Sequence, residues 1–434
     1  MGGILKAAIY SLGCKVNIYE SEYVENLLKK SGYQIVSFDS DDADVYIINT
    51  CSVTNEADRK SRKIINRAKK HNAIVVAMGC YTQVNPDSVS CDIVIGNKDK
   101  SRIVELINQV LDKKMPIKNI YDLRSDTGFE DMEITKFDNH TRAFVKIQDG
   151  CNAFCSYCII PYARGRVRSR SQEEILEEIS QLCENGCQEF VITGIHVTSY
   201  GVDIGNTSLI DLLEAISEIS QVKRIRLGSL EPQIITDEFA KALSEIPQIC
   251  AHFHLSLQSG CDATLKRMNR HYTAEEYKRG CDTLRRWFDH PALTTDVIVV
   301  FPGETDEEFE ICKTFLEDIS FAQMHIFKYS KRQGTRAAVM ENQVDEQIKT
   351  KRSDILLALD AKLQQEYRDF WAERTMEVLL EEDVEIDGKT YMTGHSKEYI
   401  KVAVPKNNEK SNDVIKVKSI GQNSKEFMNC ERMD

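Results

Sequence analysis

The chain has 434 residues, of which 42% are hydrophobic and 29% charged, and its formal net charge is −12. This length predicts two to four domains with ample core, and the composition is that of a folded globular protein. No apolar stretch approaches the ~18 residues that span a bilayer, and the N-terminus lacks the basic flank and apolar run of a signal peptide. We therefore expect a cytoplasmic protein without a membrane partner.

Local sequence features matter more than these averages. Fourteen cysteines are many for a reducing compartment, where disulfides are not expected, so several should be metal ligands. The negative net charge excludes a uniformly basic nucleic-acid binder but leaves room for local basic surfaces. Two basic runs stand out: Arg59–Lys70 holds seven basic residues and no acidic one, and Arg164–Arg170 places Arg at every second position.

The first hundred residues alternate between short runs rich in Ile and Val, which are typical of buried parallel strands, and helical stretches. The runs are Ala7–Leu12, Val45–Ile48 and Ile74–Met78, and the helical stretches are Tyr19–Ser31 and Glu56–Lys70. The alternation predicts an α/β fold that begins with a doubly wound parallel βαβ domain, over residues 1–115. Residues 116–141, with Pro116 and the acidic stretch Asp126–Glu133, predict a polar linker.

From 142 to 370 the alternation resumes. Strands are predicted at Ala143–Ile147, Glu189–Thr193, Arg224–Leu227, His252–Leu257, Thr295–Val300 and Met324–Tyr329. Helices are predicted at Glu173–Glu184, Ile210–Ile219, Ala274–Phe288, Glu307–Asp318 and Asp345–Ala372. Six βα units indicate a barrel, full or partial, whose strand C-termini face the chemistry.

Residues 371–434 predict a small all-β domain. Its strand-like runs are Met376–Leu380, Thr390–Thr393, Ile400–Val404 and Val414–Ile420, separated by turns with Gly, Asn and Pro. Between Gly388 and Lys425, eight Lys and three acidic residues give a local charge of +5.

The strongest motif is Cys151, Cys155 and Cys158, spaced CxxxCxxC directly after the first strand of the second domain. A loop at the barrel mouth would carry all three thiols. A cubane iron–sulfur cluster needs four ligands, so three thiolates leave one iron open to a small molecule. The alternative is structural zinc, which usually requires a fourth Cys or His nearby, and the following residues offer none.

A second set of three cysteines is scattered. Cys14, Cys51 and Cys80 each end a predicted parallel strand, and the C-termini of such strands lie along one edge of the sheet. They can therefore converge as a second three-thiol site. The alternative is three buried core thiols, because free Cys packs as a small hydrophobe.

With these motifs the chain resembles the radical S-adenosylmethionine (SAM) methylthiotransferases over essentially its whole length. The matching segments are NTCSVTNEA, QDGCNAFCSYCIIPYARGRVRSR, HLSLQSG, LKRMNRHYT, FPGET and FKYSKRQGT. FVITGIHVTSYGVD and HFHLSLQSG look closest to the branch that modifies N6-threonylcarbamoyladenosine in tRNA. The other branches would carry GQN-like or AQD-like text at Gly194–His196.

The resemblance implies a partial (βα)6 radical-SAM barrel, a C-terminal RNA-binding barrel like the TRAM module, and two [4Fe–4S] clusters. The cluster at Cys151, Cys155 and Cys158 would bind SAM and cleave it to a 5′-deoxyadenosyl radical. The cluster at Cys14, Cys51 and Cys80 would deliver sulfur, and a second SAM would donate the methyl group. The implied partners are tRNA, a sulfur source and an electron donor such as flavodoxin or ferredoxin.

The resemblance also implies further site residues. Expected SAM contacts are Tyr157, Thr193, Gly194, Ser229, Glu231, Ser256, Gln258, Phe327 and Tyr329. Expected RNA contacts are Arg59, Arg62, Lys63, Arg67, Lys397 and Lys401, with Tyr391 or Tyr399 stacking on a base. Arg164–Arg170 is expected to contact phosphate or the cofactor carboxylate.

Four other functions remain open on sequence alone. The same chemistry could act on isopentenyladenosine in tRNA or on a ribosomal-protein aspartate. A radical SAM enzyme that forms a different product would need only Cys151, Cys155 and Cys158. A non-enzymatic, metal-stabilised RNA-binding protein would hold zinc and would be colourless, whereas iron–sulfur clusters would make it brown.

Overall fold

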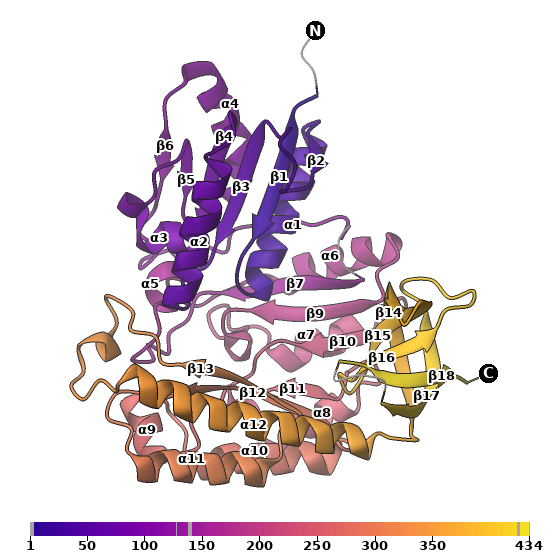
Figure 1. Cartoon of the computed structure of the whole chain (residues 1–434). Helices are drawn as coiled ribbons and strands as arrows, with labels where there is room; N and C mark the ends of the chain where they lie inside the picture. The colour runs from indigo at the N-terminus through magenta and orange to yellow at the C-terminus, as the bar shows by residue number, and fades with distance from the viewer. Residues whose placement is uncertain (1–3, 127, 138–140, 423–425, 434) are drawn as a thin grey trace.

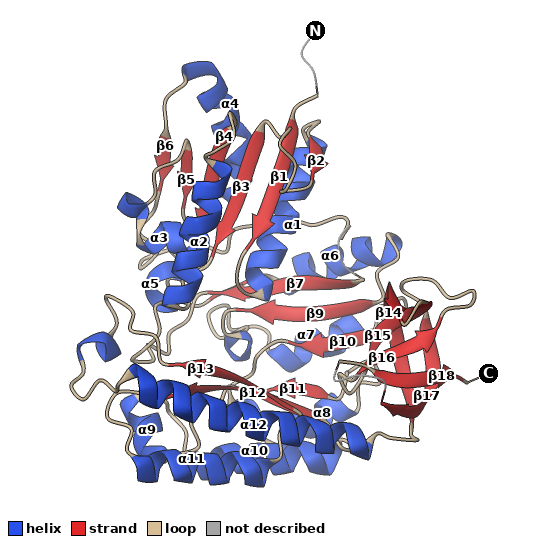
Figure 2. Ribbon diagram, in the orientation of Figure 1, coloured by secondary structure: helices blue, strands red, loops and turns tan. Residues whose placement is uncertain are grey.

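The computed structural model describes residues 4–126, 128–137, 141–422 and 426–433. Figures 1 and 2 show a parallel sheet flanked by helices, a curved array of strands and helices below it, and a small β-barrel at the C-terminal end. Parts of the predicted linker (127 and 138–140) and of the basic stretch (423–425) lie outside the described residues. No helix among those described is both long enough and apolar enough to cross a bilayer.

The N-terminal part forms one parallel sheet between helices. Its elements are β1 (Lys6–Ser11), α1 (Lys15–Lys30), β2 (Gln34–Val36), β3 (Val45–Thr50), α2 (Asn55–Ala68), β4 (Ile74–Gly79), α3 (Cys80–Val84), η1 (Pro86–Ser88), β5 (Ile93–Ile95), η2 (Lys100–Arg102), α4 (Ile103–Lys113) and β6 (Ile117–Asn119). The described strands run in the order β2-β1-β3-β4-β5-β6. Helices α1 and α4 pack on one face and α2 on the other, so the predicted doubly wound arrangement is confirmed. β6 falls within the range predicted as linker.

Three helices of this part begin at or shortly after a cysteine, namely α1, α2 and α3. The predicted start of α1 at Tyr19 is wrong: the helix begins at Lys15, because the Asn17 amide donates to the carbonyls of Leu12 (2.6 Å) and Thr50 (3.1 Å) and anchors the first turn. α2 begins shortly after Cys51, where the Thr54 hydroxyl accepts a hydrogen bond from the Ala57 N–H at 3.1 Å.

The central part contains two sheets that together form an open barrel. Its elements are β7 (Arg142–Asp149), α5 (Ile160–Arg164), β8 (Arg168–Ser169), α6 (Gln172–Glu184), β9 (Glu189–Gly194), η3 (Val197–Ser199), α7 (Leu209–Ser217), β10 (Arg224–Leu227), η4 (Pro232–Ile234), α8 (Asp237–Ser244), β11 (His252–His254), α9 (Asp262–Arg267), α10 (Ala274–Trp287), β12 (Ala292–Val299), α11 (Asp306–Ile319), β13 (Gln323–Lys328), η5 (Arg336–Val339) and α12 (Glu346–Phe370).

Within the described residues these sheets have the strand orders β10-β9-β7-β8 and β11-β12-β13. Parallel bridges Ile225↔Ile249 and Leu230↔Leu255 connect them. Strands β7, β9, β10, β11, β12 and β13 therefore form a parallel arc, which confirms the partial (βα)6 barrel. The predicted end of the fourth strand at Leu257 is wrong: β11 ends at His254, because the Tyr272 hydroxyl occupies the carbonyls of Ser256 and Leu257, each at 2.6 Å.

The C-terminal part is a closed barrel in the order β14-β15-β16-β18-β17. Its strands are β14 (Thr375–Ile386), β15 (Lys389–Ser396), β16 (Lys401–Pro405), β17 (Val414–Gln422) and β18 (Met428–Arg432). The small β domain is confirmed, although β18, whose sequence MNCER is largely polar, escaped prediction. Arg226 of β10 docks this barrel: it donates to the carbonyls of Ser396 (3.1 Å) and Lys397 (3.3 Å) and lies over the ring of Tyr399.

Candidate active site

The first three cysteines lie at the carboxyl ends of neighbouring strands. Cys14 follows β1, Cys51 follows β3, and Cys80 follows β4 as the first residue of α3. Parallel strands end at the same edge of a sheet, so distant sequence positions meet there. A Cβ atom built on Gly13 would lie only 2.8 Å from the Cys51 Sγ, which shows how closely the two strand ends approach. The structure thus brings these three predicted residues together.

The second three cysteines occupy the loop between β7 and α5. The Cys151 N–H donates to the Gly165 carbonyl at 3.0 Å, and the Cys158 N–H donates to the Cys155 carbonyl at 3.0 Å. These bonds fold the loop into a compact turn at the barrel mouth. The guanidinium of Arg270 donates to the Cys155 Sγ at 3.2 Å and offers positive charge to that thiol.

Neither set is arranged as a preformed site for a single metal ion. Within the described residues, neither set brings its three sulfur atoms all within 4.8 Å of one another. A tetrahedral zinc ion with Zn–S bonds of about 2.3 Å would hold them about 3.8 Å apart. All six are free thiols, and Cys14 is exposed, unlike a core thiol. Burial raises the pKa of Cys51 and Cys158 to about 12, so only a bound metal would hold them as thiolates at neutral pH.

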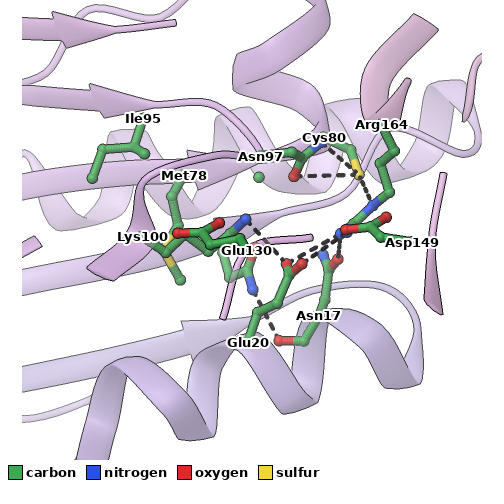
Figure 3. Close-up of polar contacts among 12 residues, drawn as sticks. Asn17, Glu20, Met78, Cys80, Ile95, Asn97, Lys100, Glu130, Asp149 and Arg164 are labelled. Atoms are coloured by element: carbon green, nitrogen blue, oxygen red, sulfur yellow. Dashed lines mark hydrogen bonds and ion pairs between the residues drawn. The ribbon is translucent and has the colours of Figure 1, made fainter. Parts of the chain in front are cut away.

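A buried ion network connects the two cysteine sets (Figure 3). Arg164, which ends the helix after the second set, donates from Nε to the Cys80 Sγ of the first set at 3.3 Å. Its Nη1 pairs with Glu20 of α1 at 2.8 Å and with Asp149 of β7 at 3.1 Å. Its Nη2 donates to the Asn17 Oδ1 at 2.9 Å. One side chain therefore contacts the first sheet, the second sheet and a cysteine.

Two lysines complete the network. Lys146 pairs with Glu20 at 3.0 Å and with Asp149 at 2.6 Å, and Lys100 lies 3.5 Å from Glu20. Burial raises the pKa of Glu20 and of Asp149, but the surrounding cations outweigh burial and hold both pKa values below their ordinary range. Both carboxylates are therefore ionised, and each is compensated inside the protein.

This network overturns one expectation. The sequence predicts that the arginines of Arg164–Arg170 contact phosphate or the cofactor carboxylate, yet Arg164, Arg168 and Arg170 are buried and bind protein groups. Of the four, Arg166 is exposed, with its guanidinium over the Phe154 ring. Arg168 donates to the Arg164 carbonyl at 2.9 Å, and Arg170 pairs with Glu178. The short strand β8 pairs with β7 and draws these side chains inward.

Two of the expected SAM contacts, Glu231 and Ser256, are linked to the second cysteine set through Arg270. Thr193 and Gly194 end β9, and Glu231 pairs with Arg270, which reaches Cys155. The Ser256 carbonyl accepts from Arg270 at 3.2 Å, and Gln258 is held at φ 70°. Ser229 is exposed after β10.

The expected aromatic contacts separate into two places. Tyr157 and Tyr329 both pack on Phe301, with ring centroids 6.3 and 5.3 Å apart. Phe327 is instead 44% exposed. It lines a cavity of about 700 Å³ together with Gly13, Cys51, Lys60, Lys328 and Lys331. That cavity opens on the first cysteine set rather than the second.

The expected RNA contacts also differ in their surroundings. Arg59, Arg62, Lys63 and Arg67 are exposed on α2, the helix that follows Cys51. Lys397 is engaged by the Pro247 carbonyl at 3.0 Å and by Glu377 at 3.5 Å, and the Lys401 ammonium lies over the Phe427 ring. Tyr391 is half-buried on β15. Tyr399 stacks on His252 with centroids 4.0 Å apart, so it cannot also stack on a base.

Sequence reasoning missed the residues that hold the site together. Glu20, Lys146 and Asp149 lie in segments that read as ordinary helix and strand. Lys15 was missed as well, although it follows Cys14 directly. Burial, together with the charges of Arg226 and Arg142, lowers its pKa to about 8, while Cys14 and Asp296 oppose the shift. The signal available in the sequence was a lysine directly after Cys14, at the end of a predicted strand.

We expect Arg164→Met to lower the free energy of unfolding by about 3–5 kcal/mol, because Glu20 and Asp149 would lose a buried counter-charge. Anaerobic urea unfolding measures this. Arg59→Met is the matched control, since Arg59 makes only an exposed pair with Glu56 and should leave stability nearly unchanged. Equal losses in the two variants would contradict a structural role for the network.

Comparison with known proteins places these observations in a family. The Radical SAM superfamily profile matches residues 145–316, and that of Uncharacterized protein family UPF0004 matches residues 6–96. The threonylcarbamoyladenosine tRNA methylthiotransferase MtaB of Bacillus subtilis (strain 168) is 39% identical over 95% of this chain and 93% of its own length. The MtaB protein of Thermotoga maritima is 36% identical over 95% and 94%.

Two further comparisons are more distant. The tRNA-2-methylthio-N(6)-dimethylallyladenosine synthase of Acetivibrio thermocellus is 34% identical over 87% of this chain and 81% of its own. Among solved structures, the radical SAM methyltransferase TsrM of Kitasatospora setae superposes with a TM-score of 0.57 at 14% identity, over 78% of this chain and 74% of that one. It supports the fold alone. The sequence identities and coverage, together with the two cysteine sets, show that the chain is an enzyme of the radical SAM methylthiotransferase family, which uses SAM and [4Fe–4S] clusters.

Proposed function

We propose that this enzyme converts N6-threonylcarbamoyladenosine at position 37 of tRNA, next to the anticodon, to its 2-methylthio derivative, with one SAM as radical source and one as methyl donor. The observation that carries the proposal is the identity of 36–39% to threonylcarbamoyladenosine methylthiotransferases over nearly the whole chain. The dimethylallyladenosine synthases are less similar, with 34% identity over 87% of the chain in one case.

The two cysteine sets are proposed as cluster ligands. Cys151, Cys155 and Cys158 would hold one [4Fe–4S] cluster, and Cys14, Cys51 and Cys80 the other. When bound, the first supplies the electron that cleaves SAM and the second supplies sulfur. Three thiols at each site leave one iron open for these tasks. Arg270 and Arg164 would each donate a hydrogen bond to one ligand sulfur.

The chain's polar groups at the barrel mouth are proposed to bind and orient SAM. The candidates are Thr193, Gly194, Ser229, Glu231, Ser256 and Gln258, with Tyr157, Phe327 and Tyr329 as aromatic contacts. The Glu231 carboxylate is the best placed for the methionyl amine, because Arg270 holds it beside Cys155.

RNA is proposed to approach along α2. Its exposed Arg59, Arg62, Lys63 and Arg67 suit phosphate contacts. The cavity beside Cys51, of about 700 Å³ and lined by four lysines, has the size of a typical small-ligand pocket and would admit a nucleoside. Lys397 and Lys401 remain weaker candidates because both already contact protein groups.

The remaining assignments follow from this function. We propose an α/β methylthiotransferase domain over 1–115, a linker over 116–141, the radical SAM domain over 142–370 and an RNA-binding TRAM-like barrel over 371–434. A reductant such as flavodoxin or ferredoxin and a sulfur source would act with the enzyme in the cytoplasm.

Nucleoside mass spectrometry tests the substrate. The reconstituted enzyme is incubated anaerobically with SAM, sulfide, a reductant and tRNA bearing either threonylcarbamoyladenosine or isopentenyladenosine. We expect a methylthio product only on the first. Product only on the isopentenyladenosine tRNA would change the proposed substrate but support the methylthiolation chemistry. SAM cleavage without product on either tRNA would refute both substrates.

Cysteine variants separate the two proposed clusters. Cys155→Ala should abolish SAM cleavage, and Cys51→Ala should retain abortive cleavage while product formation stops. Cys91→Ser, which alters a half-buried cysteine outside both sets, should behave as wild type. Normal product formation by Cys51→Ala would rule out a sulfur-delivering cluster at the first set.

Gly13 provides an independent test of the first set. At φ +102° it tolerates no Cβ, because one would lie 2.8 Å from both Cβ and Sγ of Cys51. Gly13→Ala should therefore lose the first cluster and roughly half of the protein-bound iron. Gly32→Ala is the control: Gly32 has a similar φ of +85° but nothing within 4 Å, so iron content should stay full. Full iron in Gly13→Ala would contradict the assignment.

A further inference from the structure

Three metal-ligating side chains converge on adjacent strands of the barrel, outside both cysteine sets. His254 of β11, Asp296 of β12 and His325 of β13 have ligand atoms that all lie within 4.8 Å of one another. Across the described residues, no other three His, Cys, Asp or Glu side chains suited to an ion converge this closely. The two cysteine sets are more widely spaced, so this set is the one arranged for a single ion.

Strand pairing places the three side chains on one face of the sheet. His254 pairs with Thr294, and Asp296 pairs with His325, both in parallel register. Side chains two positions apart on a strand point to the same face, so Thr294 and Asp296 point the same way. Thr295 between them points to the covering helices, where its hydroxyl accepts a hydrogen bond from a tyrosine of α10 at 3.3 Å. The three ligand residues therefore face the interior of the barrel.

This face of β13 also leads to the first cysteine set. Phe327 lies two positions after His325 on the same strand, and it lines the cavity of about 700 Å³ that Cys51 also lines. Two residues of a strand span about 7 Å, so the three side chains lie next to that cavity. His325 is exposed, and an ion can therefore reach the set from solvent.

His254 is oriented as a metal-binding histidine is. Its Nδ1 lies 3.1 Å from the Thr294 hydroxyl, and its Nε2 faces the Asp296 carboxylate at 3.5 Å. A histidine that binds a metal almost always hydrogen-bonds through its other ring nitrogen, which fixes the ring. The 3.5 Å separation exceeds a normal N–H···O hydrogen bond. Two ligand atoms on one tetrahedral ion lie about 3.4 Å apart, so the pair is spaced to share an ion.

The Asp296 carboxylate is available to a cation. Its side chain is 33% exposed, and across the described part of the chain no lysine or arginine nitrogen lies within 4.0 Å of it. Arg226 of β10 pairs instead with Glu189 at 3.0 Å. The carboxylate therefore contributes a negative charge to the set, and the two imidazoles contribute neutral nitrogen ligands.

We propose that His254, Asp296 and His325 bind a divalent transition-metal ion inside the barrel, separate from both proposed iron–sulfur sites. Imidazole nitrogens suit Zn²⁺ and Fe²⁺, whereas Mg²⁺ and Ca²⁺ prefer oxygen ligands alone. Three protein ligands leave at least one coordination position open, which water or an oxygen atom of a substrate in the barrel can occupy. The site is independent of which tRNA the enzyme modifies.

Zinc uptake by the reconstituted holoenzyme tests the proposal. Loosely bound metal is removed with a chelator, the enzyme is dialysed anaerobically against buffered free Zn²⁺, and zinc and iron are both measured by mass spectrometry. We expect wild type to take up one zinc ion per chain while its iron content is unchanged. His325→Gln and Asp296→Asn should each bind zinc at least tenfold more weakly, because each removes a ligand. Thr294→Val, which removes the hydroxyl that orients His254, should weaken zinc binding by about 10- to 100-fold.

A second measurement guards against misfolded variants. Zinc should raise the thermal unfolding temperature of wild type, since a ligand that binds only the folded chain stabilises it, and should raise that of His325→Gln much less. Full iron content in a variant shows that its fold and clusters are intact. His71→Gln is the matched control: the His71 Nδ1 also lies 3.5 Å from an aspartate, Asp41, but the described residues bring no third ligand to that pair. Its zinc binding should equal that of wild type.

Three results would overturn the proposal. The first is the absence of zinc uptake by wild type at micromolar free Zn²⁺. The second is zinc uptake that His325→Gln and Asp296→Asn leave unchanged, which would place the ion elsewhere. The third is zinc gained only in exchange for iron, which would assign it to a cysteine set. None of these results bears on the proposed substrate, which the nucleoside measurement tests separately.

Discussion

The arrangement of this enzyme depends on a buried salt-bridge network between two sheets that are remote in sequence. Arg164, at the end of the helix α5 that follows the second cysteine set, contacts Glu20, Asp149 and the Cys80 sulfur of the first set. Charges in a protein interior are tolerated only when they are compensated, so the pairing fixes geometry strongly. If α1 moved away from β7, ionised carboxylates would be left without partners. The network therefore holds the two cysteine sets at a defined separation.

In the proposed function two reactions meet at one adenosine, so a fixed separation of the two cysteine sets matters. SAM is proposed to bind at the second set and sulfur at the first, and the nucleoside must contact both. The cavity beside Cys51 and the basic face of α2 provide an approach from the side of the first set. The proposed approach of RNA and the first cysteine set therefore lie on the same side of the junction between the two sheets.

Much of this could be predicted from local sequence pattern. Alternating Ile/Val runs and helical stretches determine the two α/β parts, since buried parallel strands and amphipathic helices have distinct periodicities. Cys151, Cys155 and Cys158 are recognisable because their spacing is local. Cys14, Cys51 and Cys80 were predictable because each ends a strand, and parallel strands share an edge. Predicted element boundaries were wrong where a side chain hydrogen-bonds to the backbone near the end of an element. Contacts of Tyr272 end β11 earlier than predicted, and contacts of Asn17 begin α1 earlier than predicted.

The sequence by itself therefore determined the fold class, the two cysteine sets and the family resemblance. Only the tertiary structure decided which charged residues are available to ligands. Arg164, Arg168 and Arg170 look like a nucleic-acid contact in sequence but are buried among protein groups, whereas Glu20, Lys146 and Asp149 look ordinary and form the buried ion pairs between the two sheets. The physical reason is that a charge acquires its role from its partners and its burial. Both are set by contacts between segments that may lie more than a hundred residues apart, as Arg164 and Glu20 do.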